Sequence, residues 1–388
     1  MRFLLSILDI IATLCYIKAM KLIAQVKLLP TKAQAKSLKR TMERTNSACN
    51  YLSQHAWDDH TFGQYNLHKL AYYDTRHEFL DLSSQTVVRC ISRVADAYKL
   101  DHKTRRSFRP YSAIAYDDRI LTWRVTKSFV SIWTVAGRQH IPFVCGERQR
   151  ELLRTRQGES DLVLRQGKWY LYATCNVEEP ELIQPEDVLG IDLGIVNLAA
   201  DSDGEVFSGE ATEKNRRIYE HRRRSLQRKG TKAAKRKLRQ LSGKQANFQK
   251  TTNHTISKRI AQKAQVTKRA IAVENLVGIR SRTTVRRSQR ARHANWSFYQ
   301  LKQQIAYKAK IAGVPLLEVD PRNTSRTCPV CGCIDKANRR IQAIFSCVSC
   351  GFSGPADTVA AKNISWRGQR QLAERSVAIH DQGLSSLR

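Results

Sequence analysis

An acidic residue at the centre of an apolar segment restricts what this chain can fold into. Residues 188–204 read VLGIDLGIVNLAADSDG, in which Asp192 is flanked by apolar side chains and by two glycines. The apolar and β-branched residues predict a buried strand. An isolated ionised carboxylate in a buried strand costs several kcal/mol unless it is paired or holds a metal ion. The segment therefore requires a partner for Asp192 elsewhere in the chain.

Two further acids stand in similar surroundings. Glu274 lies in the apolar run AIAVENLVG, and Asp357 lies in GPADTVAAKNI at the start of a predicted helix. Either each acid is satisfied locally by hydrogen bonds or an arginine, or the three converge on metal ions. Two Mg²⁺ ions held by carboxylates and water would stabilise the attacking and leaving oxygens of a phosphodiester cleavage. We expect the second arrangement, with Asp192, Glu274 and Asp357 as catalytic metal ligands.

The net charge of the chain indicates a polyanionic partner. The chain has 67 Lys and Arg against 34 Asp and Glu, which gives a formal charge of +33. Self-repulsion of this size favours nucleic acid as the partner, with a membrane surface as the second option. Hydrophobic residues make up 41% of the chain, so we expect a folded basic protein rather than a disordered one.

The cysteines form a cluster near the C-terminus. Cys328 and Cys331 make one C-x2-C pair, and Cys347 and Cys350 make a second after fifteen intervening residues. This spacing predicts a structural zinc site with four thiolates and no open position for substrate. Chance and redox chemistry are the alternatives. Cys333 breaks the spacing and is not an expected ligand. The pattern suits a reducing compartment rather than a disulfide framework.

Hydrophobic periodicity divides the chain into a β-rich half with helices and an α/β half. A strand over 20–30 is followed by a helix from Thr31 to about Trp57 and by a second helix over 84–100. Short strands separated by glycine turns over 112–179 predict a small antiparallel barrel or sheet. After an acidic linker, alternating strands and helices favour an α/β domain. Its expected elements are a hairpin after 188, a polar helical region over 212–270, strands over 270–279 and 315–320, and helices over 297–312 and from about 357.

The first nineteen residues, MRFLLSILDIIATLCYIKA, form a short apolar segment interrupted by Asp9. The segment is shorter than a membrane-spanning helix needs. A signal peptide is one alternative, but we expect a dispensable extension (1–19) that precedes a start at Met20.

The motifs together resemble the TnpB family of transposon-encoded, RNA-guided DNA endonucleases, which is related to the type V CRISPR effectors. The segments that carry the resemblance are GIDLGIVNLAADSDG, AVENLVGI, WSFYQLKQQIAYKAKIAGVPLLEVDPRNTSRTCPVCG and FSCVSCGFSGPADTVAAKNI. The match is specific over about 186–366 and rests on element order over 20–185. Asp192, Glu274 and Asp357 match the three catalytic acids of the family in order and in motif.

The resemblance implies a fold of the α/β plus β class. An RNase H-like (RuvC) nuclease domain would span 186–320 and 355–388, with an inserted zinc ribbon over 321–354 and a basic helical insert over 212–270. A wedge-like β-barrel, formed by 20–30 and 112–185, would precede it and carry a helical recognition insertion over 31–111.

The resemblance also implies partners and cofactors. The partners would be a guide RNA transcribed from the transposon end and a double-stranded DNA target beside a short adjacent motif. Two Mg²⁺ ions would be catalytic and one Zn²⁺ ion structural. We expect a cytoplasmic bacterial protein that associates with the nucleoid through DNA, with neither a membrane nor a small molecule as partner.

The basic insert is the expected nucleic-acid surface. Residues 212–270 contain 20 Lys or Arg against two Glu, which suits a channel that holds an RNA–DNA heteroduplex by its backbone. A solvated helix face is the alternative. The densest part supplies candidate phosphate contacts: Arg222, Arg223, Arg224, Arg228 and Lys229. Candidates for reading the adjacent motif lie on the first predicted helix: Asn50, Tyr51 and Gln54.

One position departs from the family pattern. The family commonly has Asn two residues after the last Asp, where this chain has Val359. A nuclease-silent, RNA-guided DNA-binding repressor therefore stays open, although the intact set of acids argues against it. A strand-transfer transposase is a third reading. The zinc ribbon between the second and third acids, and the lack of an obvious helix-turn-helix, argue against the transposase.

Overall fold

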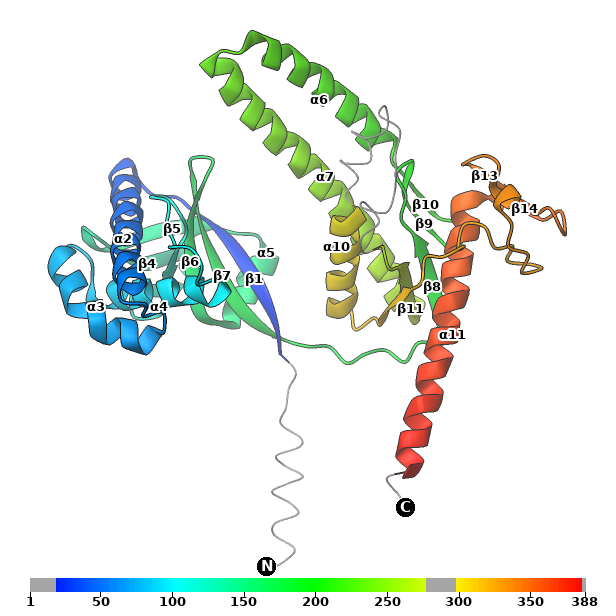
Figure 1. Ribbon diagram of the computed structural model, residues 1–388, viewed down its shortest axis with the longest axis horizontal. Helices are drawn as coiled ribbons and strands as arrows, with labels where there is room; N and C mark the ends of the chain where they lie inside the picture. Colours follow the sequence, from blue (N-terminus) through cyan, green and yellow to red (C-terminus); the bar gives the residue numbers. More distant parts are fainter. Residues whose placement is uncertain (1–18, 277–297, 386–388) are drawn as a thin grey trace, which may run out of the picture. The chain divides into compact units, whose positions relative to one another are not determined.

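The computed structural model describes residues 19–276 and 298–385, with side-chain surroundings as far as residue 374. The chain forms two compact units, Met1–Glu178 and Glu179–Arg388 (Figure 1). The apolar segment 1–19 lies outside the described residues except for Ala19, so its role stays a prediction. Within the described ranges, no helix combines the length and apolar character needed to cross a bilayer.

The first unit is built on a curved antiparallel sheet of seven strands in the order β2-β6-β7-β1-β5-β4-β3. The two end strands are consecutive in the chain, and the Trp123 indole of β3 donates to the Ser160 hydroxyl of β6 over 3.3 Å, so the sheet is nearly closed. One face encloses an apolar core. The strands are β1 Ala19–Leu28, β2 Ile114–Tyr116, β3 Leu121–Arg124, β4 Phe129–Thr134, β5 Gly137–Val144, β6 Arg156–Arg165 and β7 Lys168–Glu178.

Helices occupy the connection between β1 and β2. They are α2 Lys32–Asp58, α3 Gln64–Glu78 and α4 Ser84–Leu100, and a short α5 Glu147–Arg154 follows β5. The predicted start at Thr31 is confirmed, because Thr31 and Gln34 form a reciprocal capping box. Helix α3 was not predicted from the sequence. Only Leu67, Ala71 and Thr75 of this helix are buried, a stripe too narrow to give a helical hydrophobic pattern.

The second unit contains a five-stranded mixed sheet in the order β10-β9-β8-β11-β12. Its strands are β8 Asp187–Asp192, β9 Asn197–Asp201, β10 Val206–Ser208, β11 Arg269–Glu274 and β12 Leu316–Val319. Strands β8, β11 and β12 are mutually parallel, whereas β9 and β10 are antiparallel to their neighbours. The carboxyl ends of β8 and β11 therefore lie at the same edge of the sheet.

Helices bury both faces of this sheet, which explains why its strands are continuously apolar. On one face, Leu189 and Ile191 of β8 pack in a core with α7 Lys232–Val266 and α10 Phe298–Ile311. On the other face, Val188 packs with α11 Ala356–Ser385. In Figure 1, α11 runs along the sheet beside β8 and β11.

Gly190 permits the close approach of α11. A Cβ at this position would lie 2.1 Å from the carbonyl oxygen of Ala361 and 2.4 Å from the backbone nitrogen of Ser365. The Ser365 hydroxyl donates to the Val188 carbonyl over 2.6 Å. The first of the two glycines beside Asp192 is thus a packing requirement of the helix that covers the strand.

The basic insert is a helical hairpin rather than one long helix. Its first arm is α6 Glu210–Lys229, which ends at Gly230 with a φ of +62°, and Thr231 caps the second arm, α7. Figure 1 shows the two arms running side by side away from the sheet. The glycine accounts for the turn, because a left-handed backbone costs other residues free energy.

A small module follows β12. It contains a 3₁₀ turn, η1 Lys336–Arg339, and a hairpin of β13 Ile344–Ser346 and β14 Ser353–Pro355. Its apolar centre consists of Phe345 and the cysteines Cys328 and Cys347, and it extends to Ala356 and Val359 at the start of α11. The module is thereby attached to the helix that bears Asp357.

Candidate active site and metal centre

The three predicted acids lie at one edge of the second unit. Asp192 is the last residue of β8, and Glu274 is the last residue of the adjacent parallel strand β11. Asp357 lies in the first turn of α11. In open α/β sheets, the carboxyl ends of the strands are where ligands bind. The tertiary structure thus gathers residues from three separate parts of the chain.

The acids influence one another electrostatically. Burial, and then the negative charges of Glu274 and Asp357, raise the pKa of Asp192 to about 7. Burial also raises the pKa of Glu274 above its ordinary value. A site in which several carboxylates disfavour one another's ionised form is one that a divalent cation stabilises.

Neighbouring polar groups orient two of the acids. The Asn197 amide, at the start of β9, donates to Asp357 Oδ2 over 2.8 Å. An Arg339 guanidinium nitrogen lies 3.1 Å from Asp357 Oδ1. The Thr324 hydroxyl donates to Glu274 Oε1.

Asn363 couples the helix of Asp357 to the loop that contacts Glu274. Its buried side-chain amide donates to the backbone carbonyls of Thr324 and Thr327 over 2.7 and 2.8 Å. Asn363 lies on α11, so one helix bears an acid and also fixes the loop whose hydroxyl reaches another acid.

The donor set suits a hard cation. Carboxylate oxygens are the ligands that Mg²⁺ prefers, whereas thiolates select zinc. The three carboxylates do not form a cluster of ligand atoms within 4.8 Å of one another; in the described part of the chain, the cysteine quartet meets that condition.

The four predicted zinc ligands do form a compact cluster. The Sγ atoms of Cys328, Cys331, Cys347 and Cys350 all lie within 4.8 Å of one another. The pairs Cys328–Cys350 and Cys331–Cys347 are each separated by 3.6 Å. Tetrahedral zinc with a Zn–S distance of about 2.3 Å implies sulfur atoms about 3.8 Å apart. The cluster therefore has the dimensions of a four-thiolate metal site.

The two cysteine pairs have the same local geometry. Gly332 and Gly351 each have a φ of +74°, and each donates its N–H to the carbonyl of the first cysteine of its pair, over 3.0 and 3.1 Å. Backbone N–H donation, chiefly from Cys350, lowers the pKa of Cys347 to about 6, which favours the thiolate that a metal requires.

Arg339 is a candidate functional residue that the sequence analysis missed. It belongs to η1, between the two cysteine pairs, and its positive charge also lowers the pKa of Asp192. A lone arginine in a basic chain gives no pattern that distinguishes it. Its position beside Asp357 depends on how the cysteine module is attached to α11.

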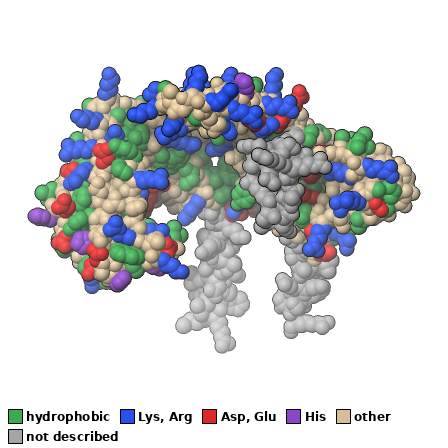
Figure 2. Space-filling model, turned by 45° about the horizontal axis from the view of Figure 1, so that its top comes forward, with side chains coloured by type: hydrophobic (Ala, Val, Ile, Leu, Met, Phe, Trp, Pro, Cys, Tyr) green, Lys and Arg blue, Asp and Glu red, His purple; other side chains and the backbone are tan. Residues whose placement is uncertain are grey.

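The predicted phosphate contacts lie on the α6–α7 hairpin, where Lys and Arg side chains crowd the surface (Figure 2). Arg222 lines a groove between the arms together with Lys237 and Lys244. Arg223 donates to Gln245, and Arg224 pairs with Glu220. Arg228 and Lys229 occupy the last turn of α6.

The three residues predicted to read the adjacent motif make intramolecular contacts in the first unit. Asn50 exchanges two hydrogen bonds with the backbone of Phe108, at 2.9 and 2.7 Å. The Tyr51 ring packs edge-on against Phe79. Gln54 donates to Asp58. These contacts give all three residues a structural role, and their reading of DNA stays a prediction.

The aromatic residues at the start of α10 differ in how far their side chains are exposed. Phe298 is buried and Tyr299 is 63% exposed, whereas Trp296 lies outside the described residues.

Val359, the position that departs from the family pattern, is buried against Phe345 and the cysteine module. Its apolar side chain therefore contributes to packing.

Comparison with known proteins finds two family models that match this part of the chain. A family model described as "Cas12f1-like, TNB domain" matches residues 298–364. A second, described as "Probable transposase", matches residues 172–280. The first covers the cysteine module and Asp357, and the second covers Asp192 and Glu274.

Individual relatives align with about half of this chain. A TnpB-like protein of Methanocaldococcus jannaschii is 30% identical over 196 residues, which are 47% of this chain and 70% of that protein. This chain belongs to the TnpB-like family. A CRISPR-associated endodeoxyribonuclease Cas12f1 of Sulfoacidibacillus thermotolerans is 36% identical over 219 residues, 52% of this chain and 50% of that protein. The putative RNA-guided DNA endonuclease InsQ of Escherichia coli K12 is 30% identical over 223 residues, 53% of this chain and 56% of that protein.

The chain spans about half the length of the Cas12f1 and InsQ relatives. Among solved structures, a Cas12f1 in complex with sgRNA and target DNA superposes with a TM-score of 0.58 at 16% identity, over 86% of this chain and 83% of that one. At that identity, the likeness establishes a shared fold.

Proposed function

We propose that this protein is an RNA-guided DNA endonuclease of a transposable element, which cleaves double-stranded DNA beside a short adjacent motif by metal-dependent hydrolysis. The observation that carries the proposal is the gathering of Asp192, Glu274 and Asp357 at one sheet edge. The order of the five strands, with β8 central and β11 and β12 parallel to it, supports the RNase H-like (RuvC) fold that the resemblance implies.

The three acids would hold two Mg²⁺ ions. Bound there, the ions would supply charge stabilisation to the attacking and leaving oxygens of a phosphodiester. The protein's own contribution is orientation: Asn197 and Arg339 fix the Asp357 carboxylate, and Thr324 fixes that of Glu274. Partial burial of Asp192 strengthens its attraction for a cation, because less water competes.

We assign the four cysteines to one structural Zn²⁺ ion. Four thiolates fill a tetrahedral coordination sphere and leave no position for substrate. The metal would act by holding the module in which η1 lies, and with it Arg339, against the start of α11.

The basic hairpin would hold nucleic acid. Its arms carry Lys and Arg in excess, and electrostatic contact with the phosphate backbone is independent of sequence. A relative named as an RNA-guided DNA endonuclease aligns over half of this chain, which supports a guide RNA as the partner that selects the target.

The first test is whether a guide is present. We expect a discrete RNA to copurify when the protein is expressed with its flanking transposon sequence, and sequencing of that RNA would define the target. If the folded protein copurifies with no discrete RNA and is inactive in every assay, the proposal that an RNA guides it is refuted.

The second test is cleavage of a plasmid that carries the target. In Mg²⁺ we expect the wild type to linearise the plasmid, and chelation to abolish cutting. Asp192→Asn should bind the target without cutting, whereas Asp118→Asn, the same change at an exposed residue of the first unit, should cut normally. Equal cutting by Asp192→Asn would refute the metal assignment. Binding without cutting by the wild type would instead support the repressor.

A further inference from the structure

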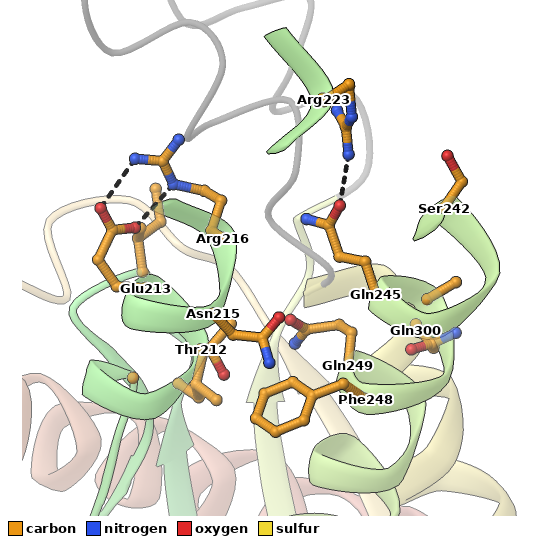
Figure 3. Close-up of a pocket in the computed structure, with 14 residues that line it drawn as sticks. Thr212, Glu213, Asn215, Arg216, Arg223, Ser242, Gln245, Phe248, Gln249 and Gln300 are labelled. Carbon is orange, nitrogen blue, oxygen red and sulfur yellow. Dashed lines mark hydrogen bonds and ion pairs between the residues drawn. The ribbon is translucent and has the colours of Figure 1, made fainter. Parts of the chain in front are cut away.

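A cavity lies in the second unit, and neither the three acids nor the four cysteines of the quartet line it. It has a volume of about 370 Å³, and its walls are formed by α6, α7 and α10 together with the loop that precedes β9 (Figure 3). All of these elements belong to the same compact unit, so the cavity is part of one packed body. This volume is in the range of pockets that hold small heteroaromatic ligands.

The cavity lining is rich in uncharged hydrogen-bonding groups. The side chains that give it this character are the amides and hydroxyls of Thr212, Asn215, Ser242, Gln245, Gln249 and Gln300. Glu213, the one carboxylate among the lining residues, forms two hydrogen bonds of 2.9 Å with Arg216. In Figure 3, Asn215 of α6 and Gln249 of α7 point toward each other across the cavity. Of the two arginines in the lining, Arg216 is paired with a carboxylate, whereas Arg223 is bonded to the neutral side chain of Gln245.

Two oxygens in this lining lack the hydrogen bonds that buried groups normally have. Thr212 Oγ1 and Asn215 Oδ1 are buried without a hydrogen-bond partner among the described residues. A buried polar atom left unpaired destabilises a fold, and such an atom in a native structure calls for an explanation. The Asn215 oxygen can only accept a hydrogen bond, so a ligand that satisfies it must donate, whereas the Thr212 hydroxyl can either accept or donate.

We propose that this cavity binds one unstacked nucleobase that carries an exocyclic amino group. The amino hydrogens would satisfy the oxygens of Thr212 and Asn215. Phe248, which lines the cavity, offers a ring for stacking. Arg223, held by its hydrogen bond to Gln245, offers a charge for the adjoining phosphate. Single-stranded nucleic acid is read in this manner, by stacking and by hydrogen bonds to base edges.

This site goes beyond the proposed nuclease function and does not depend on it, because its residues are separate from the three acids. The base could belong to RNA or to a DNA strand, and both present the same chemistry. A protein that cleaves the plasmid without recognising the base, or one that recognises the base without cleaving the plasmid, would distinguish the two proposals.

The test compares homopolymers, because backbone contacts cannot distinguish one base from another. Binding of the full-length, RNA-free protein to labelled oligo(A) and oligo(U) of about ten nucleotides, and to oligo(dA) and oligo(dT), is measured at constant salt. We expect tighter binding of the adenine strand by about fivefold to tenfold, the effect of one or two hydrogen bonds. A preference in the RNA pair alone assigns the site to RNA, one in the DNA pair alone assigns it to DNA, and one in both assigns it to the base.

Two variants each remove one acceptor, and a third variant is the matched control. Thr212→Val and Asn215→Leu should bring the ratio of the two dissociation constants close to one. Asn247→Leu, on the exposed part of the same hairpin, should leave it unchanged. Thr212→Val removes a buried unpaired oxygen at nearly constant shape, so its melting temperature should stay equal or rise. No preference in the wild type, or the same preference in Thr212→Val, would overturn the proposal.

Discussion

Arg339 of the cysteine module lies 3.1 Å from Asp357 of α11, measured from guanidinium nitrogen to carboxylate oxygen. Their side chains are only 22% and 23% exposed, so water screens this ion pair less than it would screen one on the open surface. The pair joins the proposed zinc module directly to the proposed catalytic edge. We therefore expect the integrity of the module to affect the proposed cleavage, although no cysteine is expected to contact substrate.

Arg339→Ala should reduce plasmid cleavage while target binding persists. The change removes a positive charge and a hydrogen bond from Asp357, and loss of one such electrostatic contact in an active site costs about 10²-fold to 10³-fold in rate. Arg339→Lys should retain part of the rate, since it keeps the charge without the planar guanidinium. Cleavage kinetics with saturating guide and target measure both. Arg340→Ala, at the exposed neighbouring position, is the control; equal rates for both alanine variants would contradict the role of Arg339.

Replacing a cysteine of the quartet should release zinc. We expect one equivalent of zinc in the wild type by elemental analysis, and less in Cys347→Ser because the tetrahedral set is then incomplete. Cys333→Ser should retain the full equivalent, since Cys333 lies outside the cluster of four sulfur atoms. Cleavage should fall with zinc content, because Arg339 is held by the same module. Full zinc in Cys347→Ser would show that the quartet is not the site.

The ion-free protein should lose stability as the pH rises toward neutrality. Asp192 has a pKa of about 7 in the folded protein, against about 3.9 in an unfolded chain. The folded state therefore binds the proton more tightly, and the stabilisation present at low pH disappears as the pH rises through the folded pKa. Asp192→Asn cannot ionise, so the difference in melting temperature between about pH 5 and about pH 8 should shrink by a few degrees.

Thermal unfolding in a chelator, with wild type and Asp192→Asn side by side, measures this effect. Adding Mg²⁺ at the higher pH should raise the melting temperature of the wild type more than that of the variant, because a ligand that binds only the folded state stabilises it. An identical pH dependence in the two proteins would mean that Asp192 is not the titrating group.

The loop between β12 and the cysteine module should matter for activity through Thr324. Thr324→Val removes the hydroxyl that donates to Glu274 at nearly constant shape, so cleavage should slow by about tenfold while the melting temperature changes little. Thr327→Val, which removes a hydroxyl bonded to Asn323 in the same loop, is the control. Cleavage by Thr324→Val at the control's rate would exclude the orienting role.

Asn363→Leu should act mainly on stability. It leaves the carbonyls of Thr324 and Thr327 without their side-chain donor, and each unpaired buried group costs about 1–3 kcal/mol. The melting temperature should therefore fall. Cleavage should also fall when it is measured at temperatures at which the protein is still folded. An unchanged melting temperature would show that these hydrogen bonds do not fix the loop.

Local patterns in the sequence were sufficient for several features. The helix start at Thr31 followed from side-chain capping, which involves only neighbouring residues. The cysteine pairs followed from their spacing, because each C-x2-C turn is a local structure closed by its own backbone hydrogen bond. The narrow stripe of α3 and the turn at Gly230 were missed, since neither alters the hydrophobic period strongly.

The amino-acid sequence by itself determined that Asp192 needed a partner and that four cysteines could share a metal, because burial cost and ligand spacing are properties of short segments. Only the tertiary structure decided which residues meet. The order of five strands brings Glu274 beside Asp192, the close approach of α11 at Gly190 carries Asp357 to the same edge, and the attachment of the cysteine module delivers Arg339. These contacts join residues far apart in the chain, and their geometry is set by the packing of whole elements rather than by any local preference.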